Sequence, residues 1–179
     1  LDAIKKLLSR RTKVVFLANP DNPTGTWIGA SELTPFLDAV PKETLVVLDE
    51  AYVEFVDAPG FPDSLALRRK YPNLVVLRTY SKIYGLAGLR LGYGLARPEV
   101  VEYVDRVRAP FNVNLVAQAA GVAALDDESH LEASRALVRE ERPFLAAGLA
   151  ALGAIVVPSQ GNFVFADFPG RPGKELFEA

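Results

Sequence analysis

The chain has 179 residues, half of them hydrophobic, and a net charge of −2. This length predicts about one domain with a real core, and the balanced charge excludes a general attraction to nucleic acid or anionic membranes. The absence of cysteine excludes disulfides and thiolate metal sites, and the single histidine, His130, excludes a multi-histidine metal cluster. No apolar run approaches the roughly 20 residues that span a bilayer, and no signal peptide opens the chain. We therefore expect a cytoplasmic protein without metal, nucleic-acid or membrane partners.

The first part of the chain alternates short apolar runs with helical patterns. Three runs of strand length, rich in valine and leucine, lie at 14–17, 45–48 and 74–77. Such runs are typical of parallel strands that are buried on both faces. Apolar spacing near 3.6 predicts helices between them at 32–40 and 64–70, with Ser31 and Asp63 as candidate caps. This βαβαβ order predicts an α/β fold with a mostly parallel open sheet and helices on both faces.

The second part reads differently. A further strand is predicted at 89–96, helices at 98–108, 115–125 and 129–152, and short strands at 154–157 and 162–166. Pro143 lies inside the longest helix and should kink or break it. We place a domain boundary near Asp126, which separates residues 1–126 from residues 127–179. Both ends of the chain lie in helical patterns, so we expect an internal fragment of a longer protein.

Two polar motifs follow the first two strands directly. The first is Asn19-Pro-Asp-Asn-Pro-Thr-Gly25, which alone predicts a tight turn, although an asparagine amide held there could donate to a phenolate oxygen of a ligand. The second is Asp49-Glu-Ala-Tyr52. Its acidic residue could be a helix cap or a metal ligand, or a buried carboxylate that keeps a pyridine nitrogen protonated.

The third motif follows the third strand and contains Lys82. Thr79 and Ser81 flank this lysine, glycines follow, and Arg90 lies eight residues after it. Most lysines are solvated and many arginines form structural salt bridges. A desolvated lysine can also act as a Schiff-base nucleophile, and an arginine can hold a phosphate through its planar donor fork.

The three motifs should converge, because ligands of open α/β sheets bind at the carboxyl ends of the strands. Together they point to pyridoxal phosphate (PLP) chemistry. The chain resembles the class I/II, fold-type I PLP-dependent aminotransferases through three ordered motifs. These are Asn-Pro-x-Asn-Pro-Thr-Gly, Asp-x-x-Tyr, and Ser-Lys with an arginine eight residues after the lysine.

This resemblance implies a role for each matched residue. Lys82 would bind PLP as a Schiff base, and Asp49 would pair with the pyridine nitrogen. Asn22 and Tyr52 would contact the phenolic oxygen of the ring.

The remaining matched residues would bind the phosphate. By the same resemblance Arg90 holds it together with Thr79 and Ser81. The resemblance also implies a three-layer α/β/α large domain that includes residues 1–126, part of a small α+β domain at 127–179, and a homodimer.

Three further segments, 52–55, 108–114 and 159–165, are similar to the histidinol-phosphate aminotransferase subgroup. The implied reaction is amino-group transfer between histidinol phosphate and a 2-oxo acid, in histidine biosynthesis. Threonine-phosphate decarboxylases and aromatic aminotransferases resemble the same subgroup and remain alternatives. A cofactor-free binding module is a third alternative, and it predicts that Lys82, Asp49 and Arg90 do not converge.

Other parts of the family pattern have no match in this sequence. The glycine turn that caps the phosphate and the aromatic residue that stacks on the ring are expected upstream of Leu1. The arginine that binds the substrate carboxylate is expected downstream of Ala179. We therefore expect residues 1–179 alone to be inactive.

Overall fold

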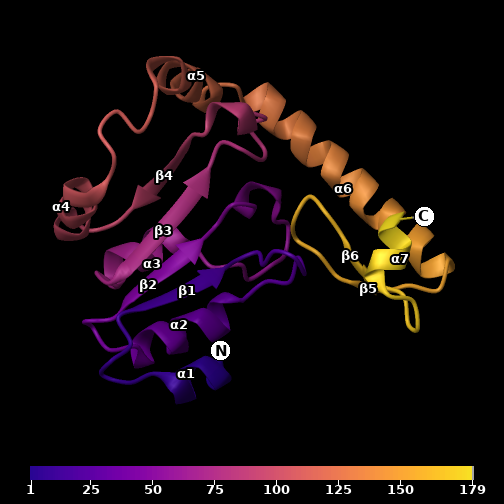
Figure 1. The fold of residues 1–179 in the computed structure, drawn as a ribbon, viewed down its shortest axis with the longest axis horizontal. Coiled ribbons are helices and arrows are strands. Elements are labelled where there is room, and N and C mark those ends of the chain that lie inside the picture. Colours follow the sequence, from indigo (N-terminus) through magenta and orange to yellow (C-terminus); the bar gives the residue numbers. More distant parts are fainter. Residues whose placement is uncertain (179) are drawn as a thin grey trace.

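The computed structural model describes residues 1–178 (Figure 1). A four-stranded sheet occupies the first part of the chain, and the long helix α6 leads from it to a two-stranded sheet near the C-terminus. The helices are α1 (Asp2–Leu7), α2 (Ala30–Ala39), α3 (Ser64–Lys70), α4 (Pro98–Val107), α5 (Leu115–Leu125), α6 (Glu128–Ala151) and α7 (Gly173–Glu178). The strands are β1 (Val14–Ala18), β2 (Leu45–Asp49), β3 (Leu74–Thr79), β4 (Gly92–Leu95), β5 (Ile155–Val157) and β6 (Phe165–Asp167).

The larger sheet has the order β1-β2-β3-β4. The first three strands pair in parallel, so the α/β class and the three predicted strands are confirmed. The fourth strand is shorter than predicted and antiparallel to β3. Residues 80–91 return the chain directly beside β3, and such a return without a crossover helix gives antiparallel pairing. The two strands of the smaller sheet also pair antiparallel.

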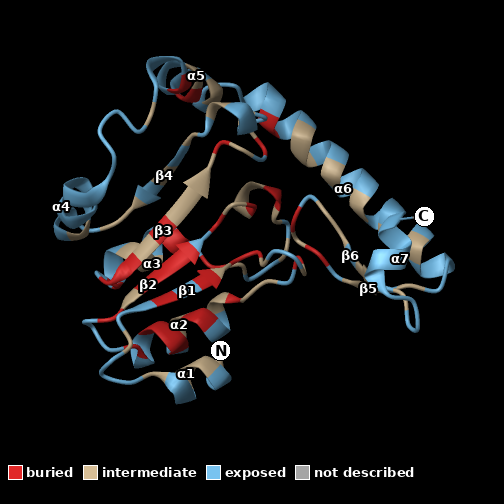
Figure 2. Ribbon diagram, in the orientation of Figure 1, coloured by how far each residue is buried: buried red, intermediate tan, exposed pale blue. Residues whose placement is uncertain are grey.

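One face of the larger sheet carries the hydrophobic core. Alternate strand residues, among them Leu17, Leu48 and Val76, point to this face and are buried. Helix α2 packs on it with Leu33 and Phe36, which have no exposed surface, and Figure 2 shows the buried residues gathered at this contact. Helices α1 and α3 add partly buried residues to the same cluster. Both βαβ crossovers place their helices on one side because right-handed crossovers in a sheet that grows in one direction do so.

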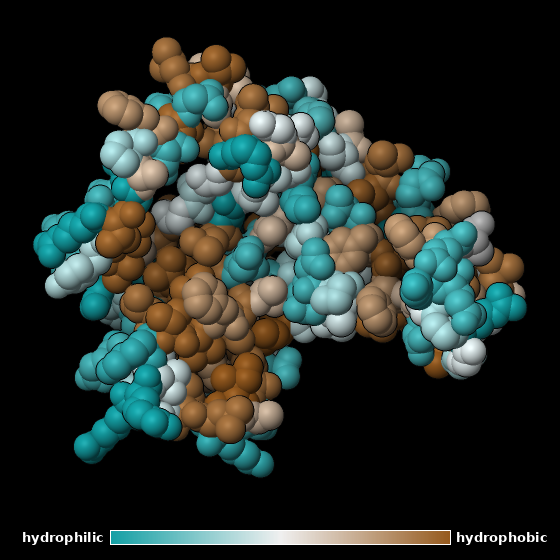
Figure 3. Space-filling model, in the orientation of Figure 1, coloured by the Kyte–Doolittle hydropathy of each residue, from teal (hydrophilic) through white to brown (hydrophobic). Residues whose placement is uncertain are grey.

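The other face of the sheet is only partly covered by residues 1–178. Phe16 is 72% exposed and Val14 is 42% exposed, whereas Leu17, which points to the core face of β1, is 6% exposed. Apolar side chains gather over the sheet in the space-filling view (Figure 3). The prediction that all three strands are buried on both faces is therefore wrong for β1. The two helices of the βαβαβ series, α2 and α3, both lie on the core face of the sheet, so they form one of the two predicted helical layers.

Three local predictions concern a helix break and two caps. Helix α6 runs through Pro143, so the predicted break does not occur. The proline removes the bond to the carbonyl of Arg139, but both residues are exposed, so water can reach that carbonyl. Helix α2 begins at Ala30 with Gly29 as its N-cap, so Ser31 is not the cap. Asp63 caps α3 as predicted, and its side chain accepts a hydrogen bond from the amide of Ala66.

None of the helices among residues 1–178 is both long and apolar enough to cross a membrane. In the same residues no three acidic, histidine or cysteine side chains are grouped so that they could hold a metal ion.

Two neighbours on β1 test this layered packing. Leu17→Ala should lower the free energy of unfolding of the 179-residue chain by about 2–5 kcal/mol, because it removes buried methyl groups and leaves a cavity. Phe16→Ala should cost less than about 1 kcal/mol, since most of that ring is exposed. Urea denaturation measures both, and equal losses would contradict the assignment of the two faces.

Candidate active site

The predicted site residues gather at the carboxyl ends of β2 and β3. A hollow of about 440 Å³ lies there. It is lined by five of the seven residues predicted from the motifs, namely Asp49, Thr79, Ser81, Lys82 and Arg90. Strand β2 ends at Asp49 and strand β3 ends at Thr79, so the parallel pairing of the two strands brings these residues to one edge of the sheet.

The other two predicted residues adjoin this hollow. The side-chain amide of Asn22 donates to the hydroxyl of Tyr52 at 2.8 Å. The amine of Lys82 lies 5.2 Å from the centre of the Tyr52 ring. All three motifs therefore meet, although they follow different strands. The cofactor-free binding module predicted that Lys82, Asp49 and Arg90 would not converge, and the structure contradicts that prediction.

The loop after β1 is held by Asn19 and Gly25. Asn19 is fully buried, and its side chain donates to the carbonyl of Ile28 and accepts from the amide of the same residue. Gly25 has a φ of 75°, and a Cβ at this position would overlap Ser159. The carbonyl of Gly25 accepts a bond from the amide of Gln160 at 2.8 Å. The first asparagine of the motif thus stabilises the loop, while Asn22 is left free to reach Tyr52.

Asp49 differs from the prediction in one respect. It was expected to be a buried carboxylate, but it is exposed at the open hollow, where its Oδ1 accepts from the amide of Ala51 at 3.1 Å. The buried carboxylate is its neighbour Glu50, which has no exposed surface. Consecutive strand residues point to opposite faces, so Asp49 faces the hollow and Glu50 faces α3.

Glu50 forms an ion pair that sequence reasoning missed. Its Oε2 accepts from the Arg78 guanidinium at 2.9 and 3.0 Å and from the Ser64 hydroxyl at 2.9 Å. Its Oε1 is buried without a hydrogen-bond partner among the described residues. Burial raises the pKa of the Glu50 carboxyl, against the opposing effects of Ser64 and Arg78. A signal was available, because Glu50 and Arg78 take equivalent places on neighbouring parallel strands and carry opposite charges.

The Lys82 loop is shaped by its hydroxyl groups and glycines. The Thr79 hydroxyl accepts from the amide of Ser81 at 3.0 Å, and the amide of Gly85 donates to the carbonyl of Lys82 at 2.9 Å. Arg90 adopts a left-handed backbone conformation with a φ of 55° and donates to the carbonyl of Ala87 at 2.7 Å. The alternative reading of Arg90 as a structural salt bridge finds no carboxylate partner among residues 1–178.

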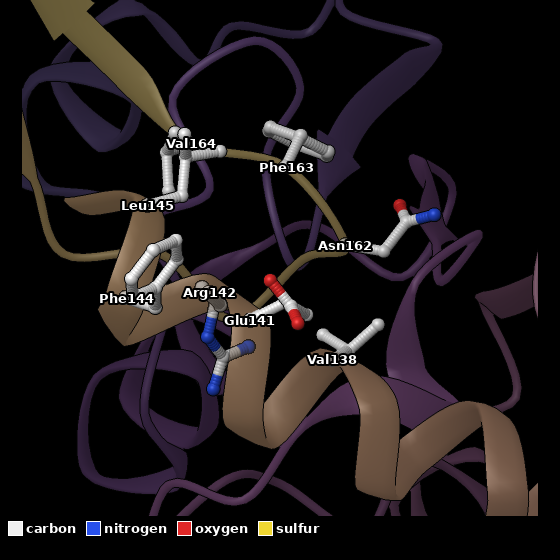
Figure 4. A pocket seen from close by; sticks show the side chains of 8 residues that line it. All are labelled: Val138, Glu141, Arg142, Phe144, Leu145, Asn162, Phe163 and Val164. Atoms are coloured by element: carbon white, nitrogen blue, oxygen red, sulfur yellow. The ribbon is translucent and has the colours of Figure 1, made fainter. Parts of the chain in front are cut away.

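The C-terminal part of the chain also reaches the site. Phe163 packs edge-on against Tyr52, with ring centres 5.0 Å apart. Close by, α6 and residues 162–164 line a second hollow of about 210 Å³ (Figure 4). The lysine loop is contacted by His130, whose Nε2 lies 2.9 Å from the carbonyl of Ile83. Phe163 had no separate role in the sequence prediction. His130 is exposed, and its ring also contacts the lysine loop.

The sequence model described as "Aminotransferase class I and II" matches residues 1–179. The chain belongs to the class I and II aminotransferase family. It is 84% identical, over its whole length, to a histidinol-phosphate aminotransferase of Anaeromyxobacter sp. strain Fw109-5, of which it covers 49%. It is 51% identical to histidinol-phosphate aminotransferase 2 of Pseudomonas fluorescens Pf-5, with 99% of the chain and 48% of the relative aligned. The chain thus spans about half the length of the curated relatives it matches.

Solved structures show the same fold. The histidinol-phosphate aminotransferase of Sinorhizobium meliloti in complex with pyridoxal 5′-phosphate gives a TM-score of 0.85 at 36% identity, over 97% of this chain and 46% of that one. The L-threonine-O-3-phosphate decarboxylase of Porphyromonas gingivalis gives a TM-score of 0.79 at 27% identity. The match covers 94% of this chain and 51% of that one. The predicted membership of the fold and of the family is therefore confirmed.

The buried ion pair predicts a pH-dependent loss of stability. Arg78→Met leaves Glu50 buried without its cation, which should cost about 3–5 kcal/mol at neutral pH. The loss should be smaller near pH 5. A carboxyl whose folded-state pKa is raised stabilises the fold below its unfolded pKa and loses that contribution as pH rises through the folded pKa.

Urea denaturation of the variant at pH 5 and pH 8 measures this effect. The matched control is Glu50→Gln with Arg78→Met, which removes both charges and should flatten the pH dependence. A pH-independent loss in the single variant would contradict the account.

Proposed function

We propose that the protein containing this chain transfers an amino group between histidinol phosphate and a 2-oxo acid and uses PLP as its cofactor. One observation carries the proposal: Lys82, Asp49 and Arg90 line one hollow in a chain that is 84% identical to a histidinol-phosphate aminotransferase. The substrates would be two small molecules, one of them amino-acid-like and the other a 2-oxo acid. The reaction would serve histidine biosynthesis.

The residues present fit a PLP molecule. The hollow of about 440 Å³ is of the usual size for a cofactor site. Its lining offers an amine at Lys82, a carboxylate at Asp49 and, at Arg90, a cation that can pair with a phosphate. Each of these groups matches one part of the cofactor: the aldehyde, the pyridine nitrogen and the phosphate.

The other polar groups complete the fit. The hydroxyls of Thr79 and Ser81 would bind phosphate oxygens beside Arg90. The bonded pair of Asn22 and Tyr52 would contact the phenolic oxygen, and it lies beside Lys82 as that role requires.

The chain's residues would then divide the chemistry among them. Bound PLP supplies an electron sink for the charge that develops at the substrate Cα. The Asp49 carboxylate holds a proton on the pyridine nitrogen, which strengthens that sink. Lys82 Nζ removes the proton from the substrate Cα, and general base catalysis of this kind contributes roughly 10²–10⁴-fold. Arg90 holds the phosphate and so fixes the distance between Lys82 and the reacting carbon.

We further propose a homodimer in the cytoplasm and a domain boundary near Asp126. Family resemblance supports the dimer, and so do apolar side chains left largely exposed at the end of α4 and in the segment before α5, such as Val107 at 84% and Phe111 at 98%. The boundary falls between the end of α5 at Leu125 and the start of α6 at Glu128. The balanced charge supports the absence of nucleic-acid and membrane partners.

The first test concerns the lysine. Borohydride reduction of the PLP-loaded protein should fix the cofactor on Lys82, because this amine lies in the hollow beside Asp49 and Arg90. Peptide mapping identifies the labelled residue. Lys82→Ala should lose the label, and Lys42→Ala, which changes an exposed lysine outside the hollow, should keep it. A label that persists in Lys82→Ala would remove the central claim.

The second test concerns the substrate. The purified full-length protein should transaminate histidinol phosphate at least about 100-fold better than phenylalanine in kcat/KM, because a site built for a phosphate leaves its donors unmatched by an apolar ring. Equal values would favour an aromatic aminotransferase. Release of carbon dioxide from threonine phosphate would favour the decarboxylase, whose fold is also shared.

A further inference from the structure

The first turns of α6 lie against both loops that carry the reacting side chains of the proposed site. His130 contacts the carbonyl of Ile83, the residue directly after Lys82, at 2.9 Å. Five residues along the helix, Arg135 Nε donates to the carbonyl of Glu54 at 2.9 Å. Glu54 lies in the short 3-10 helix that follows Tyr52. One stretch of helix thus reaches the Lys82 loop and the Tyr52 loop.

An apolar contact joins the two polar ones. Leu131 is 9% exposed and belongs to a buried cluster with Tyr52, Phe55 and Ile83. The cluster therefore takes residues from both loops and from the helix. Farther along α6, Arg142 repeats the polar pattern, with bonds to the carboxylate of Asp57 and the carbonyl of Gly161, both at 3.1 Å.

The chemistry of these contacts requires cationic or N–H donors on the helix. A backbone carbonyl only accepts hydrogen bonds, so Nε2 of His130 must carry a hydrogen. The Asp127 side chain accepts from the amide of His130 at 3.0 Å and from the Ser129 hydroxyl at 2.7 Å, which fixes the first turn of the helix. The ring is thus presented from an anchored backbone, while Lys82 itself is exposed.

We propose that His130 and Arg135 are positioning residues that fix Lys82 relative to Tyr52 by joining their two loops to α6. The inference rests on the proposed function only for the roles of Lys82 and Tyr52. The helix sets the separation of the two loops because its backbone is rigid between residues 130 and 135. The amine of Lys82, 5.2 Å from the Tyr52 ring, would then approach a substrate from a constant direction.

Amide hydrogen exchange of the full-length protein without cofactor tests the restraint directly. His130→Leu should speed exchange of the Gly85 and Leu86 amides, which bond to carbonyls within the Lys82 loop. The expected change is about fivefold, the usual net effect of one hydrogen bond. Arg135→Met should have the same effect on the amides of Phe55 and Val56.

Two matched controls separate positioning from a general loss of structure. His130→Gln keeps a planar N–H donor and should stay within about twofold of wild type. Arg139→Met removes a similar side chain on the same helix. Among residues 1–178 that side chain bonds only to Glu132, so both loops should exchange as in wild type. Faster exchange in β1 as well as in the loops would mean global destabilisation and would overturn the proposal. Unchanged exchange of the Gly85 and Leu86 amides in His130→Leu would also overturn the proposal.

Kinetics of the PLP-loaded protein supply the second readout. The double variant His130→Leu/Arg135→Met should lose about tenfold in kcat with KM within about twofold, because reacting groups are misplaced while binding groups remain. An equal change in KM alone would overturn the proposal. If wild-type protein transfers no amino group but the exchange pattern holds, the proposed function fails and the restraint stands.

Discussion

The parallel pairing of β1, β2 and β3 is the constraint on which the rest of the structure depends. Parallel strands end at the same edge, and each of these three is followed at once by polar residues. Asn22, Asp49 and Lys82, which are 60 residues apart at most, reach one region because their strands end at the same edge. The hydrophobic packing of α2 and α3 on one face fixes this pairing, so the site depends on a core that it does not touch.

The alternation of side chains along β2 places the neighbouring carboxylates of Asp49 and Glu50 on opposite faces of the sheet, where they have different roles. Asp49 faces the open hollow, where it can meet a ligand. Glu50 faces the interior, where it is bonded to Arg78 and Ser64. The ion pair joins the ends of β2 and β3 just before the site loops begin. A one-residue shift of β2 would exchange the two carboxylates, so the register of this strand is under strong chemical constraint.

Much of this arrangement was predictable from the sequence, because it follows from local patterns. Valine-rich runs predicted the three parallel strands. The motifs after them predicted the five residues that line the hollow and the two that adjoin it, although their roles stay predictions. What failed depends on neighbours distant in the chain. The exposure of Phe16 and the contact of His130 with Ile83 are set by packing that no local pattern records. The burial of Glu50 rather than Asp49, in contrast, follows from the alternation of side chains along the strand.

A contact between two segments far apart in the sequence affects how the site forms during synthesis. The side chain of Gln160 accepts bonds from the amides of Asp57 and Ala58, and the first of these spans 103 residues. A ribosome that adds roughly 5–20 residues per second would make that segment in about 5–20 s. The loop that follows Tyr52 must therefore wait on the nascent chain for its partner. Until residue 160 emerges, the backbone donors at 57 and 58 have only water to bind, and a chaperone or a protease could reach them.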